Sequence, residues 1–200
     1  MPGATIIGSP TSRKIMRGLN PGSPKECGAE ILSGRHLPPE WRGTFVTNDF
    51  RAHRVRRYRI SENGAGYASK QVSEPLRSKH ISFRPVDVKM GPDGAIYFAD
   101  WYNPIIQHGE VDFRSPMRNH QHGRVWRLSA KGRALVKRPE LAGAPEGKLL
   151  EHLKDPEDWT RHHAKRVLSH RPRTDVARAL KEWIGKLDPE DEGTGHHLLE

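Results

Sequence analysis

The spacing of the apolar residues changes after Pro139, and this change constrains the fold more than any other feature of the sequence. Before it, Val86, Val88 and Met90 alternate with charged residues, which is the two-residue period of a half-buried strand. After it, the apolar residues of 176–184 follow the i, i+3, i+4, i+7 spacing of an amphipathic helix. The sequence therefore predicts β-structure followed by α-structure.

Several short strands are expected between residues 29 and 138. The candidates cover 30–33, 43–47, 53–60, 85–90, 95–100 and 123–128. Turn sequences separate them: Asn63-Gly64 can supply the positive φ angles of a tight hairpin, and Gly91-Pro-Asp-Gly provides a second turn. Short strands at this spacing are typical of sheets and of propeller blades.

Three helices are expected in the remainder. Leu149, Leu150 and Leu153 have helical spacing, a second helix is expected to begin at Asp155-Pro-Glu-Asp, and Thr174 is expected to cap a third. The tetrapeptide Asp-Pro-Glu-Asp recurs 33 residues later, at Asp188, and the pair His162-His163 recurs at 196–197. This spacing suits an array of helical pairs.

These patterns predict an all-β region followed by an all-α region. The prediction is an irregular lead-in over residues 1–28, the last blades of a partial β-propeller over 29–138, and the start of an α-solenoid over 139–200. A propeller closes as a ring of several blades, and stacked repeats need several neighbours. Both ends therefore look cut, and we expect the chain to be an internal fragment of a larger protein.

The charge balance favours anionic partners. The sequence has 34 Lys and Arg against 24 Asp and Glu, a net charge of +10. In the arginine-rich segment 51–59, alternation can present Arg54 and Arg56 on one face beside Tyr58, as a polyanion binder requires. The alternative, which we prefer, is a charged outer strand that guards a sheet edge. Nucleic acid is accordingly not an expected partner.

Cys27 is the only cysteine, which excludes an intrachain disulfide and a Cys-x-x-Cys-His haem site. The first residues lack a charged stretch followed by an apolar one, and no apolar run has the length of a membrane span. The chain by itself is therefore expected to be cytoplasmic, without a signal peptide or a transmembrane segment. It also lacks the nucleophile elbow of hydrolases and the phosphate loop of nucleotide-binding proteins.

Five runs of residues resemble one known family. They are Cys27-Gly-Ala-Glu, Gly34-Arg-His, Asn48-Asp-Phe-Arg-Ala-His-Arg-Val, the long run from Phe83 to Gly109, and His122-Gly-Arg-Val-Trp-Arg-Leu. They resemble the membrane-bound dehydrogenase family of large exported bacterial proteins. These join a quinoprotein glucose/sorbosone dehydrogenase-like propeller, HEAT- or armadillo-type repeats and, commonly, a C-terminal haem c domain. The resemblance covers roughly residues 27–200.

The resemblance implies part of a periplasmic or otherwise extracytoplasmic oxidoreductase. Its substrates would be sugars or alcohols, its electrons would pass to haem c in a domain outside this chain, and its partners would be the remaining blades and repeats. In such relatives pyrroloquinoline quinone and calcium bind on the loop face of the propeller. No catalytic base can be assigned here, and we expect the isolated chain to be inactive. The alternatives are a non-catalytic interaction or carbohydrate-binding scaffold, and a polyanion binder.

The candidate site residues follow the strand at 95–100. Asp100 and Asn103 offer the oxygen ligands that calcium prefers, although Asp100 can instead cap the turn by accepting backbone N–H bonds. Arg114, Arg118 and Arg124 can bind a carboxylated cofactor, with solvated side chains as the alternative. Other candidates for the loop face are Trp101, His108, His120 and His122. Because the last two histidines lie in a predicted loop, a structural or exposed role is the alternative to metal binding.

Overall fold

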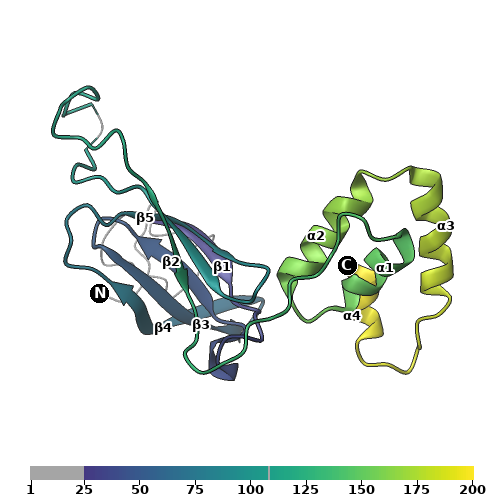
Figure 1. Ribbon diagram of the computed structural model, residues 1–200. Coiled ribbons are helices and arrows are strands. Elements are labelled where there is room, and N and C mark those ends of the chain that lie inside the picture. Colours follow the sequence, from purple (N-terminus) through teal and green to yellow (C-terminus); the bar gives the residue numbers. More distant parts are fainter. Residues whose placement is uncertain (1–24, 108) are drawn as a thin grey trace. The chain divides into compact units, whose positions relative to one another are not determined.

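A computed structural model describes residues 25–107 and 109–200, which form two compact units (Figure 1). Unit 1 comprises the described residues of 25–32, 38–90 and 96–130. Unit 2 comprises residues 33–37, 91–95 and 131–200. Two short segments that lie between strands of unit 1 in the sequence thus belong to unit 2. Most of the lead-in predicted for residues 1–28 lies outside the described residues.

Unit 1 contains two antiparallel sheets. The first has the order β1-β2-β3-β4, formed by Glu26–Ile31, Phe45–Asp49, Arg54–Asn63 and Gly66–Arg77, with a 3-10 helix at Pro39–Trp41. The second has the order β5-β6-β7, formed by Pro85–Met90, Ile96–Asp100 and Arg124–Leu128. Strand β5 packs against β1 and β2. The buried side chains between the strands include Val46, Val55, Tyr58, Val88 and Phe98.

The predicted hairpin turn is confirmed, and it leads into a strand that the sequence analysis did not predict. Asn63 of β3 pairs with Gly66 of β4 across a two-residue turn, and Gly64 has a φ of 60°. Strand β4 contains Pro75 and shows no clear alternation of apolar residues, so its sequence carries little strand signal. Because β4 covers its outer side, β3 is an inner strand, and the expected edge strand is wrong.

Unit 2 contains four short helices around one apolar core. They are α1 (Glu146–Glu151), α2 (Asp158–Ser169), α3 (Arg173–Ile184) and α4 (Thr194–Leu199), with a 3-10 helix at His152–Lys154. The core includes Leu149, Leu150, Ala164, Leu168 and Trp183. Helix α2 begins three residues after the predicted cap, because the Asp155 carboxylate accepts a hydrogen bond from the Glu157 N–H at 2.8 Å and forms a turn first. None of the described helices has the length and apolar character needed to cross a bilayer.

The predicted architecture of a partial propeller is wrong. The described strands form one sheet of four and one of three, neither of which closes, and the two sheets pack on each other through β5. Blades of a propeller would instead be separate sheets of similar size arranged around an axis. Most of the individual strands were predictable because local apolar patterns report which residues are buried, but these patterns do not report which strands pair.

The predicted start of a HEAT- or armadillo-like solenoid is also wrong. The second Asp-Pro-Glu-Asp, at Asp188, leads into a turn, and the following helix begins only at Thr194 and has six residues. Gly193 and Gly195 occupy this stretch, and glycine disfavours helix by about 1 kcal/mol relative to alanine. The two copies of the tetrapeptide therefore precede helices at different distances along the chain, and they do not mark a repeating pair of helices.

Candidate functional site

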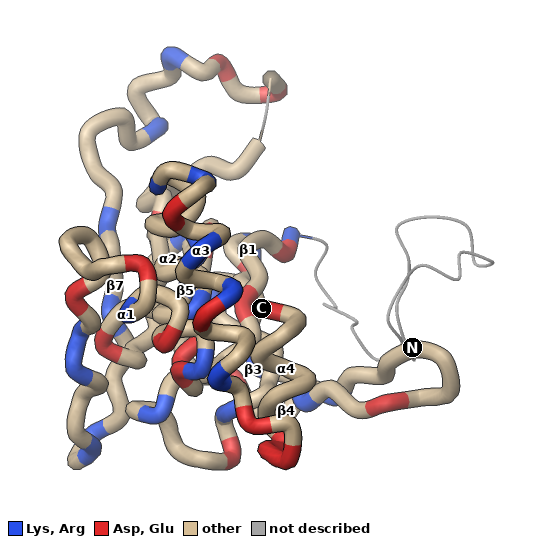
Figure 2. Tube along the Cα trace, turned by 90° about the vertical axis from the view of Figure 1, so that its right-hand side faces the viewer, with Lys and Arg blue, Asp and Glu red and all other residues tan. Residues whose placement is uncertain are grey.

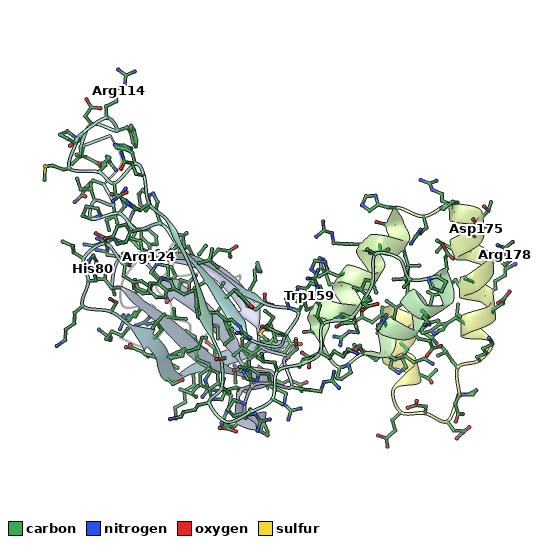
Figure 3. All side chains as sticks on the ribbon, in the orientation of Figure 1. His80, Arg114, Arg124, Trp159, Asp175 and Arg178 are labelled. Carbon is green, nitrogen blue, oxygen red and sulfur yellow. The ribbon has the colours of Figure 1, made fainter. Side chains whose placement is uncertain are left out.

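The long connection between β6 and β7 and the loop after β2 enclose a small hollow in unit 1, which we name the loop pocket. Its volume is about 340 Å³. Figure 3 shows the connection extending away from the sheets, with Arg114 at its far end. The lining residues are Phe50, Trp101, Asn103, Ile106, Gln107, Phe113, Arg118, Asn119 and His120.

Asp100 fixes the point at which the long connection leaves β6. It is only 3% exposed, and its Oδ1 accepts hydrogen bonds from the N–H groups of Arg84 at 2.8 Å and Tyr102 at 2.9 Å. Its Oδ2 accepts a hydrogen bond from the Trp126 indole at 3.0 Å. The carboxylate thus joins β6, β7 and the segment before β5, which is the turn-capping role considered as the alternative to calcium binding.

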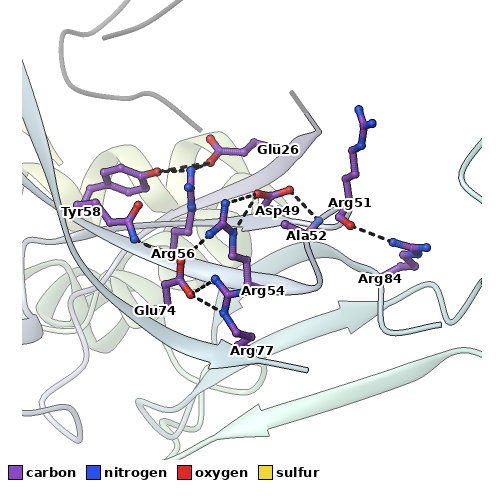
Figure 4. A network of polar contacts seen from close by, with 11 residues as sticks. Glu26, Asp49, Arg51, Ala52, Arg54, Arg56, Tyr58, Glu74, Arg77 and Arg84 are labelled. Atoms are coloured by element: carbon purple, nitrogen blue, oxygen red, sulfur yellow. Dashed lines mark hydrogen bonds and ion pairs between the residues drawn. The ribbon is translucent and has the colours of Figure 1, made fainter. Parts of the chain in front are cut away.

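Arg84 holds the two sides of the loop pocket together. Its guanidinium donates to the carbonyl oxygens of Asn103 at 2.9 Å, Pro104 at 3.0 Å and Phe50 at 2.9 Å. Figure 4 shows the same group reaching the carbonyl of Arg51. Burial lowers the pKa of Arg84 below its ordinary value, while Asp100 acts in the opposite direction. This role of Arg84 could not be predicted, because a buried arginine that binds carbonyl groups produces no recognisable pattern in the sequence.

Arg118 closes the far side of the pocket in a similar way. Its Nη2 donates to the carbonyls of Gln107 at 2.7 Å and Val111 at 2.8 Å, and its Nε donates to that of Asp112 at 3.1 Å. The guanidinium also lies 5.1 Å from the ring centre of Phe113. These contacts hold Gln107, Val111 and Asp112 against Arg118 and place Phe113 beside the pocket.

Tyr102 carries backbone strain next to the pocket. Its φ is 51°, a conformation that costs a non-glycine residue about 1–3 kcal/mol. The ring stacks on His80 at 5.6 Å, meets His122 edge-on at 5.9 Å, and lies 3.7 Å under the Arg124 guanidinium. These contacts hold the strained residue, whose two neighbours in the chain both line the pocket.

The loop pocket brings together four of the predicted site residues: Trp101, Asn103, Arg118 and His120. His122 lies outside its lining, against Tyr102 and the Asn119 side chain. His108 lies outside the described residues. Phe50, Gln107 and Phe113 also line the pocket and were not predicted from the sequence. Of these three, only Phe113 carried a usable signal, because it is an aromatic residue in a polar loop. Its side chain is 63% exposed in the structure.

The three arginines predicted to hold a carboxylated cofactor do not meet. Arg118 is bonded to loop carbonyls, Arg124 lies over Tyr102, and Arg114 is exposed at the far end of the connection (Figure 3). This arrangement does not fit a pyrroloquinoline quinone held by all three guanidinium groups, and no step proposed below uses that cofactor.

The oxygen atoms of Asp100 and Asn103 that were predicted to bind calcium already accept hydrogen bonds from the protein. Three N–H groups engage Asp100, and Asn103 Oδ1 accepts the Ile105 N–H at 3.1 Å. Among residues 25–107 and 109–200, no three His, Cys, Asp or Glu side chains are grouped as metal ligands. Calcium binding would have to replace these hydrogen bonds, and it stays a prediction.

Two of the four arginines of β3 are paired with carboxylates. Arg54 contacts Asp49 at 3.1 Å and Glu74 at 2.7 Å, and Arg56 contacts Glu26 at 3.1 Å (Figure 4). Figure 2 shows basic and acidic residues interspersed along the chain. A polyanion at Arg54 or Arg56 would have to displace these acidic partners, of which Asp49 is buried and Glu26 and Glu74 are partly buried, and this is costly.

The comparisons with known proteins give one match. A family model described as Domain of unknown function (DUF7133) matches residues 20–132, which is more than half of the chain and includes all the lining of the loop pocket. No curated protein and no solved structure matches. The chain therefore belongs to the DUF7133 domain family.

Proposed function

We propose that unit 1 binds a sugar or sugar alcohol in the loop pocket. The observation that carries this proposal is the presence of two exposed aromatic side chains, Trp101 and Phe113, beside amide groups in one small hollow. An aromatic face packs against the C–H groups of a sugar ring, and amides both donate to and accept from hydroxyl groups. The lining thus offers the two kinds of contact that a polyhydroxylated ligand needs.

The volume of the loop pocket and its exposed polar groups restrict the class of ligand further. Small-molecule pockets span roughly 300–1,000 Å³, so a hollow of about 340 Å³ suits one sugar ring better than a polysaccharide. The Asn103 amide and the Arg118 guanidinium are already engaged with the backbone. Gln107 Oε1 accepts the Ile106 N–H at 3.2 Å, and His120 Nε2 lies 3.4 Å from the Ser115 carbonyl. Both side chains are nevertheless exposed, and we assign the contacts to ligand hydroxyl groups to the Gln107 NH2 group and the His120 ring.

The resemblance to the membrane-bound dehydrogenase family supports the same ligand class. The run from Phe83 to Gly109, which carries the resemblance most specifically, contributes Trp101, Asn103, Ile106 and Gln107 to the lining. Binding is common to a sugar-oxidising protein and to a carbohydrate-binding scaffold. Oxidation of the ligand additionally needs an electron acceptor, and we place that step in a larger parent protein.

Ligand-observed NMR and calorimetry with glucose, sorbitol and related polyols test the proposal. We expect saturable binding by the 200-residue chain. Trp101→Ala should weaken it at least about tenfold, because each 1.4 kcal/mol of lost contact is a factor of ten. Tyr67→Ala is the matched control, since Tyr67 is an exposed aromatic residue on β4 outside the lining.

Two results would contradict the proposal. One is the absence of saturable binding for every polyol in the series. The other is an equal loss of binding in the Trp101 and Tyr67 variants, which would place the contact outside the loop pocket.

A further inference from the structure

Unit 2 contains a second hollow, an apolar groove of about 680 Å³ among its helices. Leu180 and Ile184 of α3 line it and are 36% and 45% exposed, so apolar surface faces solvent there. Leu150, Leu153, Leu168 and Val176 complete its apolar lining. A hollow of this size and composition lies within the range of small-molecule sites.

Two buried polar atoms in the lining lack hydrogen-bond partners. Trp183 is only 5% exposed, and its Nε1 has no acceptor among the described residues. His197 Nδ1 is closed to solvent and is likewise unpartnered within the described part of the chain. Because both atoms are closed to solvent, Trp183 is a reporter for the groove that it lines, and the contacts to a ligand are sought among the exposed groups.

Cationic side chains outnumber acidic ones around the groove. Lys165, Arg171 and Arg173 line it, against one acidic residue, Glu200. Glu200 is paired with Lys165 and Arg161, and Arg171 donates to the carbonyl of Ala142 at 3.1 Å. No hydrogen bond or ion pair engages the Arg173 side chain within residues 25–107 and 109–200. The groove therefore offers an available cation beside an apolar surface.

We propose that this groove binds a monocarboxylate with an apolar chain, such as a medium-chain fatty acid. The carboxylate of the ligand pairs with Arg173 at the start of α3, and its chain lies along Leu180 and Ile184 toward the end of that helix. Apolar burial adds affinity with each methylene group, and the guanidinium binds the carboxylate through two parallel hydrogen bonds. This site is in unit 2 and does not depend on the sugar site of unit 1.

Octanoate titrated into the full chain is the first probe, observed by calorimetry and by the NMR signal of the Trp183 indole N–H. We expect saturable binding and a shift of that signal, because the Trp183 ring lines the groove. Octanol, which has the same chain without the charge, should bind at least about fivefold more weakly.

Arg173→Gln should weaken octanoate binding about fivefold or more and leave octanol binding unchanged. Arg178→Gln is the matched control, because Arg178 lies on the same helix, is exposed, and pairs with Asp175 outside the groove lining (Figure 3).

The proposal is overturned if octanoate does not saturate the chain, or if octanoate and octanol bind equally. It is also overturned if Arg178→Gln weakens binding as much as Arg173→Gln. A failure of octanoate to saturate the chain would indicate that a protein segment occupies the groove. Equal binding of octanoate and octanol would indicate nonspecific apolar adsorption.

Discussion

Buried polar residues, more than apolar ones, give the loop pocket its shape. Arg84 and Arg118 donate to backbone carbonyls, and Asp100 accepts from two backbone N–H groups and an indole. A loop that runs away from a sheet has no ladder partners, so its polar backbone groups must be satisfied by side chains. Each of these residues therefore holds a stretch of backbone in place.

The single cysteine gives a prediction at the same scale. Burial, together with the nearby carboxylates of Asp87, Asp49 and Glu26, raises the pKa of the Cys27 thiol to about 11. Only the thiolate reacts with alkylating reagents. Relative to a pKa of 9.0 in the unfolded chain, alkylation by iodoacetamide at pH 8 should be about 100-fold slower in the folded protein.

Mass spectrometry of the alkylated protein, with and without urea, measures this ratio. The unfolded chain is its own control, because the sequence holds no second cysteine. Similar rates in both states would mean that the Cys27 thiol on β1 is not protected by the neighbouring strands.

At the scale of elements, a bulge in β1 allows the two sheets of unit 1 to approach closely. The pairing of β1 with β2 shifts register between Cys27 and Ala29, and Gly28 has a φ of 65°. A Cβ atom at Gly28 would lie 2.9 Å from the Cα of Asp87 on β5. Glycine is required there both by the backbone conformation and by the space.

We therefore expect Gly28→Ala to destabilise unit 1 by about 3 kcal/mol in urea unfolding. Gly43→Ala is the matched control, because Gly43 also has a positive φ, of 73°, but a Cβ there meets no atom within 4 Å. It should cost only about 1 kcal/mol, from the left-handed conformation. Equal losses in the two variants would show that the contact with β5 is not tight.

A carboxylate links the two strands of the β3–β4 hairpin. Partial burial of Glu74 acts to raise its pKa, but the hydrogen bond from Arg77 and the charge of Arg54 together lower it below the ordinary value of 4.5. A lowered folded-state pKa stabilises the protein above the unfolded pKa. This contribution is lost as the pH falls below about 4.5 through the folded pKa.

Glu74→Gln should accordingly be less stable than the parent chain at pH 7, and the difference should shrink below about pH 4.5. Urea unfolding at a series of pH values measures it. Glu62→Gln is the control, since Glu62 is an exposed residue of β3. A pH-independent difference for Glu74→Gln would contradict the charge-based explanation.

At the scale of the whole molecule, the two units are interleaved along the chain. Residues 33–37 and 91–95 belong to unit 2, although strands of unit 1 flank both segments. In the first of these segments, Arg35 binds Glu157 through its backbone N–H at 2.8 Å and its Nε at 2.9 Å. Glu157 is only 3% exposed, so it depends on this partner.

Arg35→Ala should therefore destabilise unit 2 by about 2 kcal/mol, because it leaves a buried carboxylate without its cation. Hydrogen exchange of α2 should show the loss of protection. Arg178→Ala removes an exposed pair with Asp175 and should cost less than about 0.5 kcal/mol. Unchanged protection of α2 in Arg35→Ala would mean that residues 33–37 do not support the helices.

The elements and part of the site could be predicted from the sequence, and the pairings could not. Alternation located β5, a nearly continuous apolar run located β6, and helical spacing located α3, because these patterns report burial within one element. The propeller and solenoid predictions were wrong because they required knowledge of which strands and helices meet. Trp101 and Asn103 were found by their position after a strand, whereas Phe50 comes from a distant loop.

The sequence by itself determined that β-structure precedes α-structure, the hairpin turn at Gly64 and four of the residues that line the loop pocket. The tertiary structure decided the two sheets, the inner position of β3, and the pairing of Arg84 with Phe50 and of Arg35 with Glu157. Local spacing fixes which face of an element is apolar. Contacts between distant residues depend on packing and on the satisfaction of buried polar groups, which local patterns do not encode.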